Sequence, residues 1–270
     1  MNSVRFNQHF NMLLILLTEF IHRIQGFSSM SRQGRLTSRR RARITPYEPS
    51  ESEAKFGRQS YWEHIYQVQQ KESLKSSNKA FAWYSTWDDI EPFWLDLVPD
   101  QQSKVLIAGV GNDPCLVSMY DTGWRNIHAF DYAPQGVQLA TELMGPERLV
   151  PKGKAQLQVA DARDLKDKFH DGQFDAIFEK GTFDAIFLSG GPDSQRRLKN
   201  LAMAIQEMQR VLKPGGLILS ITSIAIEPIF NVFANSPSWE IMRDSREVYL
   251  TDSGFASNNV DATMFAFHKR

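Results

Sequence analysis

The sequence predicts an α/β fold in which helices cover both faces of a seven-stranded, mainly parallel sheet. From Lys104 onward, short apolar runs alternate with helical segments, as in repeated strand–helix units. The first run leads into KVLIAGVGN, where two glycines stand one residue apart, and the second ends in the acid of HAFDY. Strand, tight turn, helix, strand and acid in this order are typical of a nucleotide-binding half of a doubly wound sheet.

The apolar runs place the expected elements along the chain. Strands are expected at residues 104–108, 126–131, 157–160, 174–179, 216–222, 245–250 and 263–268. Helices are expected at residues 114–121, 135–144, 194–212 and 227–235. Because the turn-rich GFASNN precedes the last run, we expect the final two strands to form an antiparallel hairpin.

Two further segments precede this alternation. SYWEHIYQVQQ (60–70) is predicted to form a helix that Ser60 caps, with Glu63 three residues later as in a capping box. KAFAWYSTWDDIEPFWLDLV (79–98) is rich in aromatic residues, most of which we expect to pack a helix against the sheet.

Charge divides the 270-residue chain into a basic head and an acidic body. Of 31 basic and 31 acidic residues, eight basic and one acidic residue lie in 1–47, which leaves 23 and 30 in 48–270, a net charge of −7. An acidic body argues against a nucleic-acid-binding surface and suits a basic protein partner. The single cysteine, Cys115, excludes an intrachain disulfide framework and a multi-cysteine metal site, so no metal is expected.

Residues 1–47 are predicted to be a targeting extension or a disordered basic tail. The apolar run MLLILL is too short to span a membrane, and no stable membrane association is expected. Residues 27–45 are rich in Ser and Arg and lack acids, which is the composition of organelle transit peptides. A presequence would direct the protein to a plastid or mitochondrion; otherwise we expect a cytoplasmic protein. Residues 48–59 are predicted to be a linker, and residues 60–270 one domain.

Side chains suited to bind a nucleoside follow three successive strands. Gly109 and Gly111 permit the turn and leave the backbone open to a ligand. Asp131 can accept hydrogen bonds from ribose hydroxyls, and Asp161 can accept one from the exocyclic amine of adenine. Pro114 stands where a dinucleotide fingerprint has glycine or alanine, which favours a ligand without phosphates. Each feature alone fits a turn or a helix cap, but their joint placement favours an adenosyl ligand.

Several motifs together resemble class I S-adenosylmethionine-dependent methyltransferases. They are VLIAGVGN, FDY, ADARDL, EKGTFDAI and RVLKPGG. Added to YWE..Y, F.WY and MYDTGWRNI, they more narrowly resemble the methyltransferase-like family that methylates lysine on translation elongation factor 1-alpha, from about Tyr61 to the C-terminus. The resemblance implies a Rossmann-like methyltransferase domain over residues 60–270, with S-adenosyl-L-methionine as methyl donor.

The resemblance also implies site residues and an acceptor. The predicted donor-binding residues, including Gly111 from the turn, are Trp62, Tyr66, Tyr84, Gly109, Gly111, Asp131, Tyr132, Asp161, Ala162 and Lys180. Glu179 replaces the family's usual aspartate before KGT, and we predict that it orients the acceptor amine. The implied partner is an acceptor protein with an exposed lysine, such as a translation elongation factor. A small-molecule methyltransferase and an inactive cofactor-binding scaffold or assembly factor are the alternatives.

Overall fold

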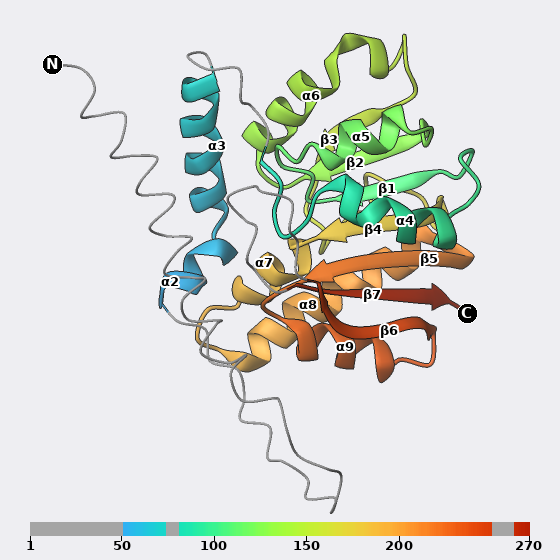
Figure 1. Cartoon of the computed structure of the whole chain (residues 1–270). Coiled ribbons are helices and arrows are strands. Elements are labelled where there is room, and N and C mark those ends of the chain that lie inside the picture. Colours follow the sequence, from blue (N-terminus) through green and yellow to red (C-terminus); the bar gives the residue numbers. More distant parts are fainter. Residues whose placement is uncertain (1–50, 74–80, 250–261) are drawn as a thin grey trace, which may run out of the picture.

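A seven-stranded sheet lies at the centre of the computed structural model, which describes residues 51–73, 81–249 and 262–270 (Figure 1). The strands are β1 (Val105–Ala108), β2 (Ile127–Asp131), β3 (Gln156–Val159), β4 (Phe174–Lys180), β5 (Leu212–Thr222), β6 (Trp239–Tyr249) and β7 (Ala262–Lys269). Their order in the sheet is β3-β2-β1-β4-β5-β7-β6. The first five strands are parallel, whereas β7 is antiparallel to both β5 and β6. The predicted mainly parallel sheet with an antiparallel C-terminal pair is confirmed, although GFASNN lies outside the described residues.

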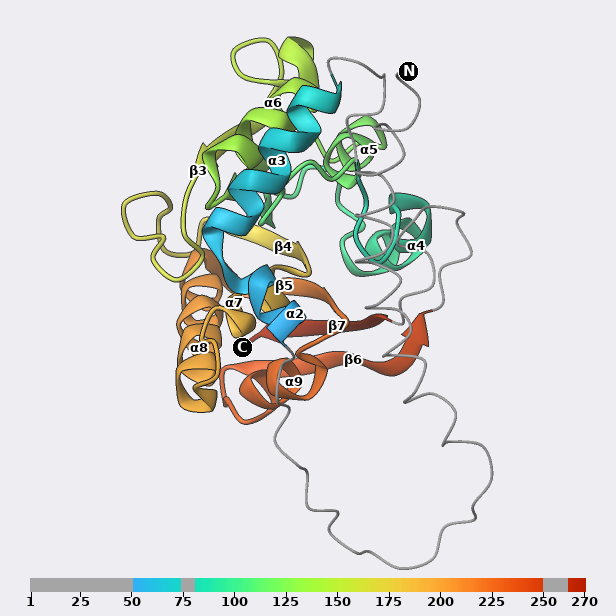
Figure 2. The ribbon, with the colours of Figure 1, turned by 90° about the vertical axis from the view of Figure 1, so that its left-hand side faces the viewer.

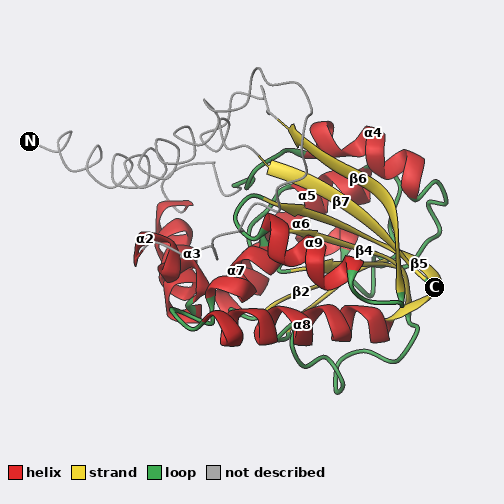
Figure 3. Ribbon diagram, turned by 90° about the horizontal axis from the view of Figure 1, so that it is seen from below, coloured by secondary structure: helices red, strands yellow, loops and turns green. Residues whose placement is uncertain are grey.

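Helices cover both faces of this sheet. One face carries α4 (Trp87–Leu97), α5 (Cys115–Asp121) and α6 (Pro134–Arg148), and the other carries α7 (Thr182–Leu188), α8 (Ser194–Val211) and α9 (Ile226–Ala234). Figure 3 shows α4 and α8 on opposite sides of the strands. Successive side chains of a strand point to opposite faces, so Ile107 of β1 belongs to the core cluster that contains Trp94 of α4, while Leu106 belongs to the cluster that contains Leu201 of α8. Across the described ranges, no helix is long and apolar enough to cross a membrane.

The sequence did not predict α7 and placed the start of β6 too late. The α7 sequence TFDAIFL is short and dominated by apolar and β-branched residues, so its pattern does not separate a helix from a continuing strand. Strand β6 begins at Trp239 rather than at residue 245. Its register shifts twice against β7, and such irregularities interrupt the alternation from which strands are predicted.

The N-terminal helical elements lie across the edge at which the parallel strands end (Figure 2). They are α2 (Glu51–Ala54), η1 (Lys55–Gly57) and α3 (Gln59–Ser73). The prediction of a linker over residues 48–59 is therefore wrong for the part that the structure describes, because η1 packs on α7. The Ser60 cap is also wrong: α3 already begins at Gln59, whose side-chain amide donates to Glu63 at 3.0 Å.

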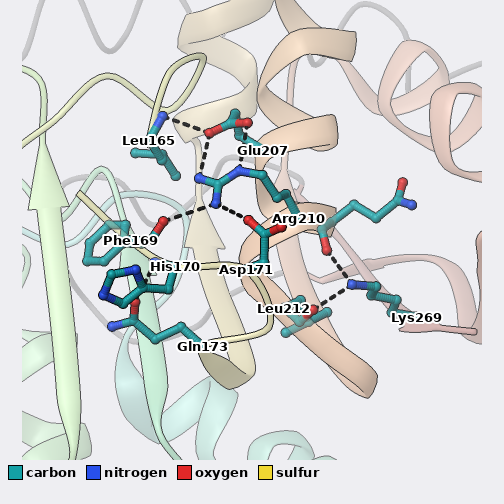
Figure 4. A network of polar contacts seen from close by, with 10 residues as sticks. Leu165, Phe169, His170, Asp171, Gln173, Glu207, Arg210, Leu212 and Lys269 are labelled. Atoms are coloured by element: carbon teal, nitrogen blue, oxygen red, sulfur yellow. Dashed lines mark hydrogen bonds and ion pairs between the residues drawn. The ribbon is translucent and has the colours of Figure 1, made fainter. Parts of the chain in front are cut away.

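An ionic network ties the opposite edge of the sheet together, where β4 and β5 begin (Figure 4). Arg210, near the end of α8, contacts Glu207 at 2.9 Å and Asp171 at 2.7 Å. Glu207 also accepts a hydrogen bond from the backbone N–H of Leu165, and Lys269 donates to the carbonyl groups of Gln209 in α8 and Leu212 at the start of β5. These contacts fix the loop before β4 to α8, and they lie away from the cavity described next.

Candidate active site

A cavity of about 280 Å³ opens where β1, β2, β3 and β4 end. In open parallel sheets ligands bind at this edge, near the point where the strand order reverses, which here lies between β1 and β4. All ten residues predicted to bind the donor line the cavity: Trp62, Tyr66, Tyr84, Gly109, Gly111, Asp131, Tyr132, Asp161, Ala162 and Lys180. The structure brings these residues together, and their binding roles stay a prediction. Glu179 is not among the lining residues.

One part of the cavity, here called the polar half, consists of residues 109–113, 131–132 and 161–163 with Tyr66 and Lys180. The glycine turn within it has left-handed backbone angles, φ +67° at Gly109 and +49° at Gly111. A Cβ on Gly109 would lie 2.1 Å from the hydroxyl oxygen of Thr182, and one on Gly111 would lie 2.5 Å from that of Tyr66. The turn thus requires glycine at both positions, and side chains of the protein already fill the space that a Cβ would take. The sequence did not reveal this second requirement.

Asp131 is the buried carboxylate of the polar half. It is 3% exposed, and its two oxygens accept hydrogen bonds from the backbone N–H groups of Gly111, at 3.0 Å, and Ala133, at 2.8 Å. Burial raises the pKa of Asp131 to about 6, although the backbone donors act in the opposite direction. Each oxygen retains a lone pair for a further donor, because an ionised carboxylate has about four acceptor sites. This geometry suits a pair of hydroxyl donors.

Asp161 and Arg163 form a bidentate ion pair at the next strand end. The guanidinium approaches the carboxylate to 2.6 Å, and the backbone N–H of Arg163 donates to it at 2.9 Å. The pKa of Asp161 is lowered because these hydrogen bonds and the positive charge outweigh partial burial, which acts in the opposite direction. Because Arg163 engages much of its carboxylate, Asp161 has less hydrogen-bond acceptor capacity left for a ligand than Asp131 has.

Lys180 is held by groups of the protein itself. Its ammonium donates to Asp113 at 2.7 Å and to the backbone oxygen of Ser85 at 2.6 Å, and it lies 3.3 Å from the sulfur of Cys115. Burial alone would lower the pKa of Lys180, but Asp113 more than offsets it and the pKa is raised. Lys180 therefore stays charged and paired, and it positions the Asp113 loop beside the end of β4.

The other part of the cavity, here called the aromatic half, consists of Phe56, Gly57, Trp83, Tyr84, residues 184–186, Leu188, Ser189 and Ile224. Trp62 joins the two halves, with ring centroids 6.0 Å from Tyr66 and 5.6 Å from Trp83. Its indole N–H donates to the backbone oxygen of Phe56 at 2.6 Å, which fixes η1 against α3. Edge-to-face packing of such rings is favourable and leaves an apolar wall.

Asp184 lies beneath this wall and is 2% exposed. Its carboxylate accepts hydrogen bonds from the hydroxyls of Tyr84, at 2.9 Å, and Thr222, at 2.5 Å. The backbone N–H groups of residues 223–225 donate to it at 2.7 to 3.2 Å. Burial raises the pKa of Asp184, with these donors acting in the opposite direction.

The structure does not place Glu179 where it could orient an acceptor amine. The side chain is fully buried, and it accepts hydrogen bonds from the hydroxyl of Ser220 and from the backbone N–H groups of Thr182 and Phe183. Glu179 precedes Lys180 on β4, and neighbouring strand residues point to opposite faces, so the carboxylate turns toward the start of α7. Burial first, and the charge of Asp184 second, raise its pKa to about 8. The role predicted for Glu179 is corrected to a structural one.

Several cavity residues were missed by reasoning from the sequence. Asp113 and Asp184 stand in the GVGN-D and KGTF-D motifs, so each could have been found as a second acid beside a predicted site residue. Trp83 precedes the predicted Tyr84 and was assigned only to packing. Phe56 had no usable signal, because its place in the wall depends on η1 folding back onto α7.

Residues 106–220 match the family model described as "Methyltransferase domain". Together with the fold, this match identifies the chain as an S-adenosylmethionine-dependent methyltransferase that is similar to the class I enzymes. Its methyl donor is accordingly S-adenosylmethionine, and the resemblance inferred from the sequence motifs is confirmed.

Curated relatives and solved structures agree with this placement. EEF1A lysine methyltransferase 4 of Mus musculus is 28% identical over 189 residues, which are 68% of this chain and 68% of that protein. The eEF1A lysine and N-terminal methyltransferase of Homo sapiens is 27% identical over 171 residues, 63% of this chain but only 22% of that protein. The crystal structure of the [4+2]-cyclase SpnF has a TM-score of 0.56, covers 78% of this chain and 96% of its own, and is 14% identical. An identity this low shows a shared fold and not a shared reaction.

The polar half fits the adenosyl part of this donor. Asp131 is held by backbone N–H groups rather than by a basic side chain, so its charge is available to hydroxyl donors and to a nearby cation. Tyr66 lies against the glycine turn and against Gly136, where a Cβ would meet its ring at 2.9 Å. The donor itself supplies an electrophilic methyl group on a positively charged sulfur.

Proposed function

We propose that this methyltransferase transfers the methyl group to a lysine of an acceptor protein. The observation that carries the proposal is the aromatic half, an apolar wall directly beside the polar half. The relatives named above are lysine methyltransferases of elongation factor 1-alpha, which makes that factor the first acceptor to test. The acidic body, with a net charge of −7 over residues 48–270, suits a basic acceptor.

A lysine must lose a proton before it can attack the methyl group. From an ordinary pKa of about 10.4, deprotonation near pH 7.4 costs about 4 kcal/mol. A water-poor pocket lowers this cost because desolvation disfavours the ammonium form. Trp83, Tyr84 and Phe56 supply such a surface, and the nearby ammonium of Lys180 is neutralised by Asp113.

Methyl transfer is an in-line displacement, so the protein acts mainly by holding both reactants and excluding water. In this proposal Asp131 binds the ribose, the Asp161–Ala162 segment borders the adenine, and Trp62 with Tyr66 packs on the donor. The acceptor side chain enters along the aromatic half. No side chain of the cavity is assigned as general base.

A methyl-label assay followed by mass spectrometry tests the proposal. Full-length protein is mixed with labelled S-adenosylmethionine and purified elongation factor 1-alpha, and separately with organelle and cytosolic extracts. Label on a lysine of a protein, absent with the Asp131→Ala variant, supports the proposal. Label only on a small metabolite would select a small-molecule methyltransferase. Failure to bind the donor at millimolar concentration in calorimetry would overturn both enzymatic functions, and donor binding without label on any acceptor would leave an inactive cofactor-binding scaffold.

We also propose that the basic extension directs the protein to an organelle. Residues 1–47 lie outside the described residues, so the proposal rests on composition alone. A fluorescent fusion of residues 1–47 should enter plastids or mitochondria, and a fusion that stays in the cytosol would contradict this.

A further inference from the structure

We propose that Asp184 is a positioning residue that holds Tyr84 as a wall of the acceptor side of the cavity. The inference rests on the proposed function and names the residues that shape its acceptor site. It also gives Tyr84 a role different from the donor contact predicted from the sequence.

The first observation is the unusual conformation of Tyr84. Its φ is +63°, and among the described residues outside glycine it alone has a positive φ. Such a conformation is unfavourable for a residue with a side chain and persists only where the surroundings enforce it. The hydrogen bond from its hydroxyl to Asp184, which lies 100 residues further along the chain, is one such constraint.

The second observation is the position of the Tyr84 ring. Tyr84 is 4% exposed, and a Cβ on Gly181 would lie 3.1 Å from its Cε2. Gly181 follows Lys180 at the end of β4, so the ring lies on the β4 side of the switch point. The turn of Gly109 and the acid of Asp131, where we place the donor, lie on the β1 and β2 side.

The third observation is that Asp184 connects two separate walls. One of its oxygens accepts from Tyr84, and the other accepts from the backbone N–H of Ile224, which also lines the cavity. Tyr84 and Ile224 both lie outside residues 106–220, whereas Asp184 lies within them. Asp184, a residue of the matched methyltransferase domain, thus sets the distance between Tyr84 and Ile224, two wall residues that lie outside that domain.

The test compares two variants that each remove one hydroxyl donor from Asp184. Tyr84→Phe keeps the ring but loses its bond to Asp184, while Thr222→Val loses a donor that does not line the cavity. We expect Tyr84→Phe to lower kcat/KM for the acceptor by at least about tenfold, because misplacement of a wall disturbs alignment. Donor affinity in calorimetry should stay within about threefold, and Thr222→Val should stay within about threefold in both measurements.

The double variant of Asp184 and Tyr84 separates positioning of Tyr84 from a purely structural role of Asp184. If Asp184 acts through Tyr84, the acceptor kcat/KM of Asp184→Asn should fall no further when Tyr84→Phe is added. Thermal unfolding of each variant shows whether the protein remains folded. Loss of donor binding in Tyr84→Phe, or equal loss of acceptor efficiency in Thr222→Val, would overturn the inference.

The two proposals fail in different ways. Wild-type protein that labels only a metabolite would refute the lysine acceptor. The same variants would then be compared on that metabolite, and only Tyr84→Phe should lower its kcat/KM. Wild-type protein that labels a lysine with unchanged kinetics in Tyr84→Phe would refute the role of Asp184 and leave the proposed function intact.

Discussion

The two halves of the cavity are built on different principles. The polar half comes mainly from the ends of successive parallel strands, and its groups are backbone N–H donors and short acids such as Asp131 and Asp161. The aromatic half is assembled from η1, the segment around Trp83, α7 and Ile224, which the fold brings together from distant parts of the chain. Much of it lies outside the residues that match the methyltransferase model, 106–220. The comparison contrasts a polar half that lies mainly within the matched methyltransferase domain with an aromatic half that is completed by segments outside it.

The largest expected effect is a loss of donor affinity when the buried acid of the polar half is changed. Asp131→Asn should weaken S-adenosylmethionine binding by about a hundredfold, since a hydrogen bond to a charged group contributes about 1.5–3 kcal/mol. Asp161→Asn should cost only a few fold, because Arg163 already engages that carboxylate. Calorimetry measures both, with thermal unfolding to show that each variant is folded. Equal losses in the two variants would contradict the unequal roles assigned to the acids.

Donor binding should also depend on pH through Asp131. Its pKa is about 6, raised by burial, so the acid is ionised above pH 6 and protonated below. Because the donor favours the ionised form, its dissociation constant should be steady above pH 7 and rise by up to about tenfold per unit below pH 6. Calorimetry from pH 5 to pH 8 measures the slope. Asp131→Asn should remove it, and a wild-type curve without a slope would count against the contact.

A glycine of η1 should affect the aromatic half alone. A Cβ on residue 57 would lie 2.3 Å from the backbone of Leu188 and Ser189, so Gly57→Ala must lift η1 away from α7. We expect acceptor kcat/KM to fall by about tenfold while donor affinity changes little. Gly153→Ala, which would meet the backbone of Arg148 at 2.0 Å, lies outside the cavity residues and controls for general destabilisation. A similar acceptor defect in the control would mean that the effect is not specific to the cavity.

The smallest effect on activity is expected at Glu179. Its pKa is raised to about 8 in the folded protein from an ordinary value of 4.5, so the folded state keeps a proton that the unfolded state releases. Its contribution to stability is therefore present below pH 4.5 and is lost as the pH rises through 8. Glu179→Gln resembles the protonated form and should flatten this dependence in urea unfolding, with kcat within about twofold. A loss of activity above tenfold in a folded Glu179→Gln protein would restore a direct catalytic role.

Local pattern sufficed for the sheet and for the polar half. Strand periodicity, the glycine turn and the acids at strand ends are properties of short segments, and parallel strands bring their carboxyl ends to one edge. That is why the sequence alone places Asp131, Asp161 and the Gly109 turn together. The same reasoning could not predict α7 or the wall contributed by Phe56, because neither is specified by a local pattern.

The sequence by itself therefore determined the fold class, the strand ends that line the cavity and the similarity to S-adenosylmethionine-dependent methyltransferases. The tertiary structure alone decided how the charged groups are used. It turned Glu179 away from the cavity, paired Lys180 with Asp113 and set Asp184 beneath Tyr84. The physical reason is that a buried charge takes its role from the groups packed around it, and those groups come from segments far apart in the chain.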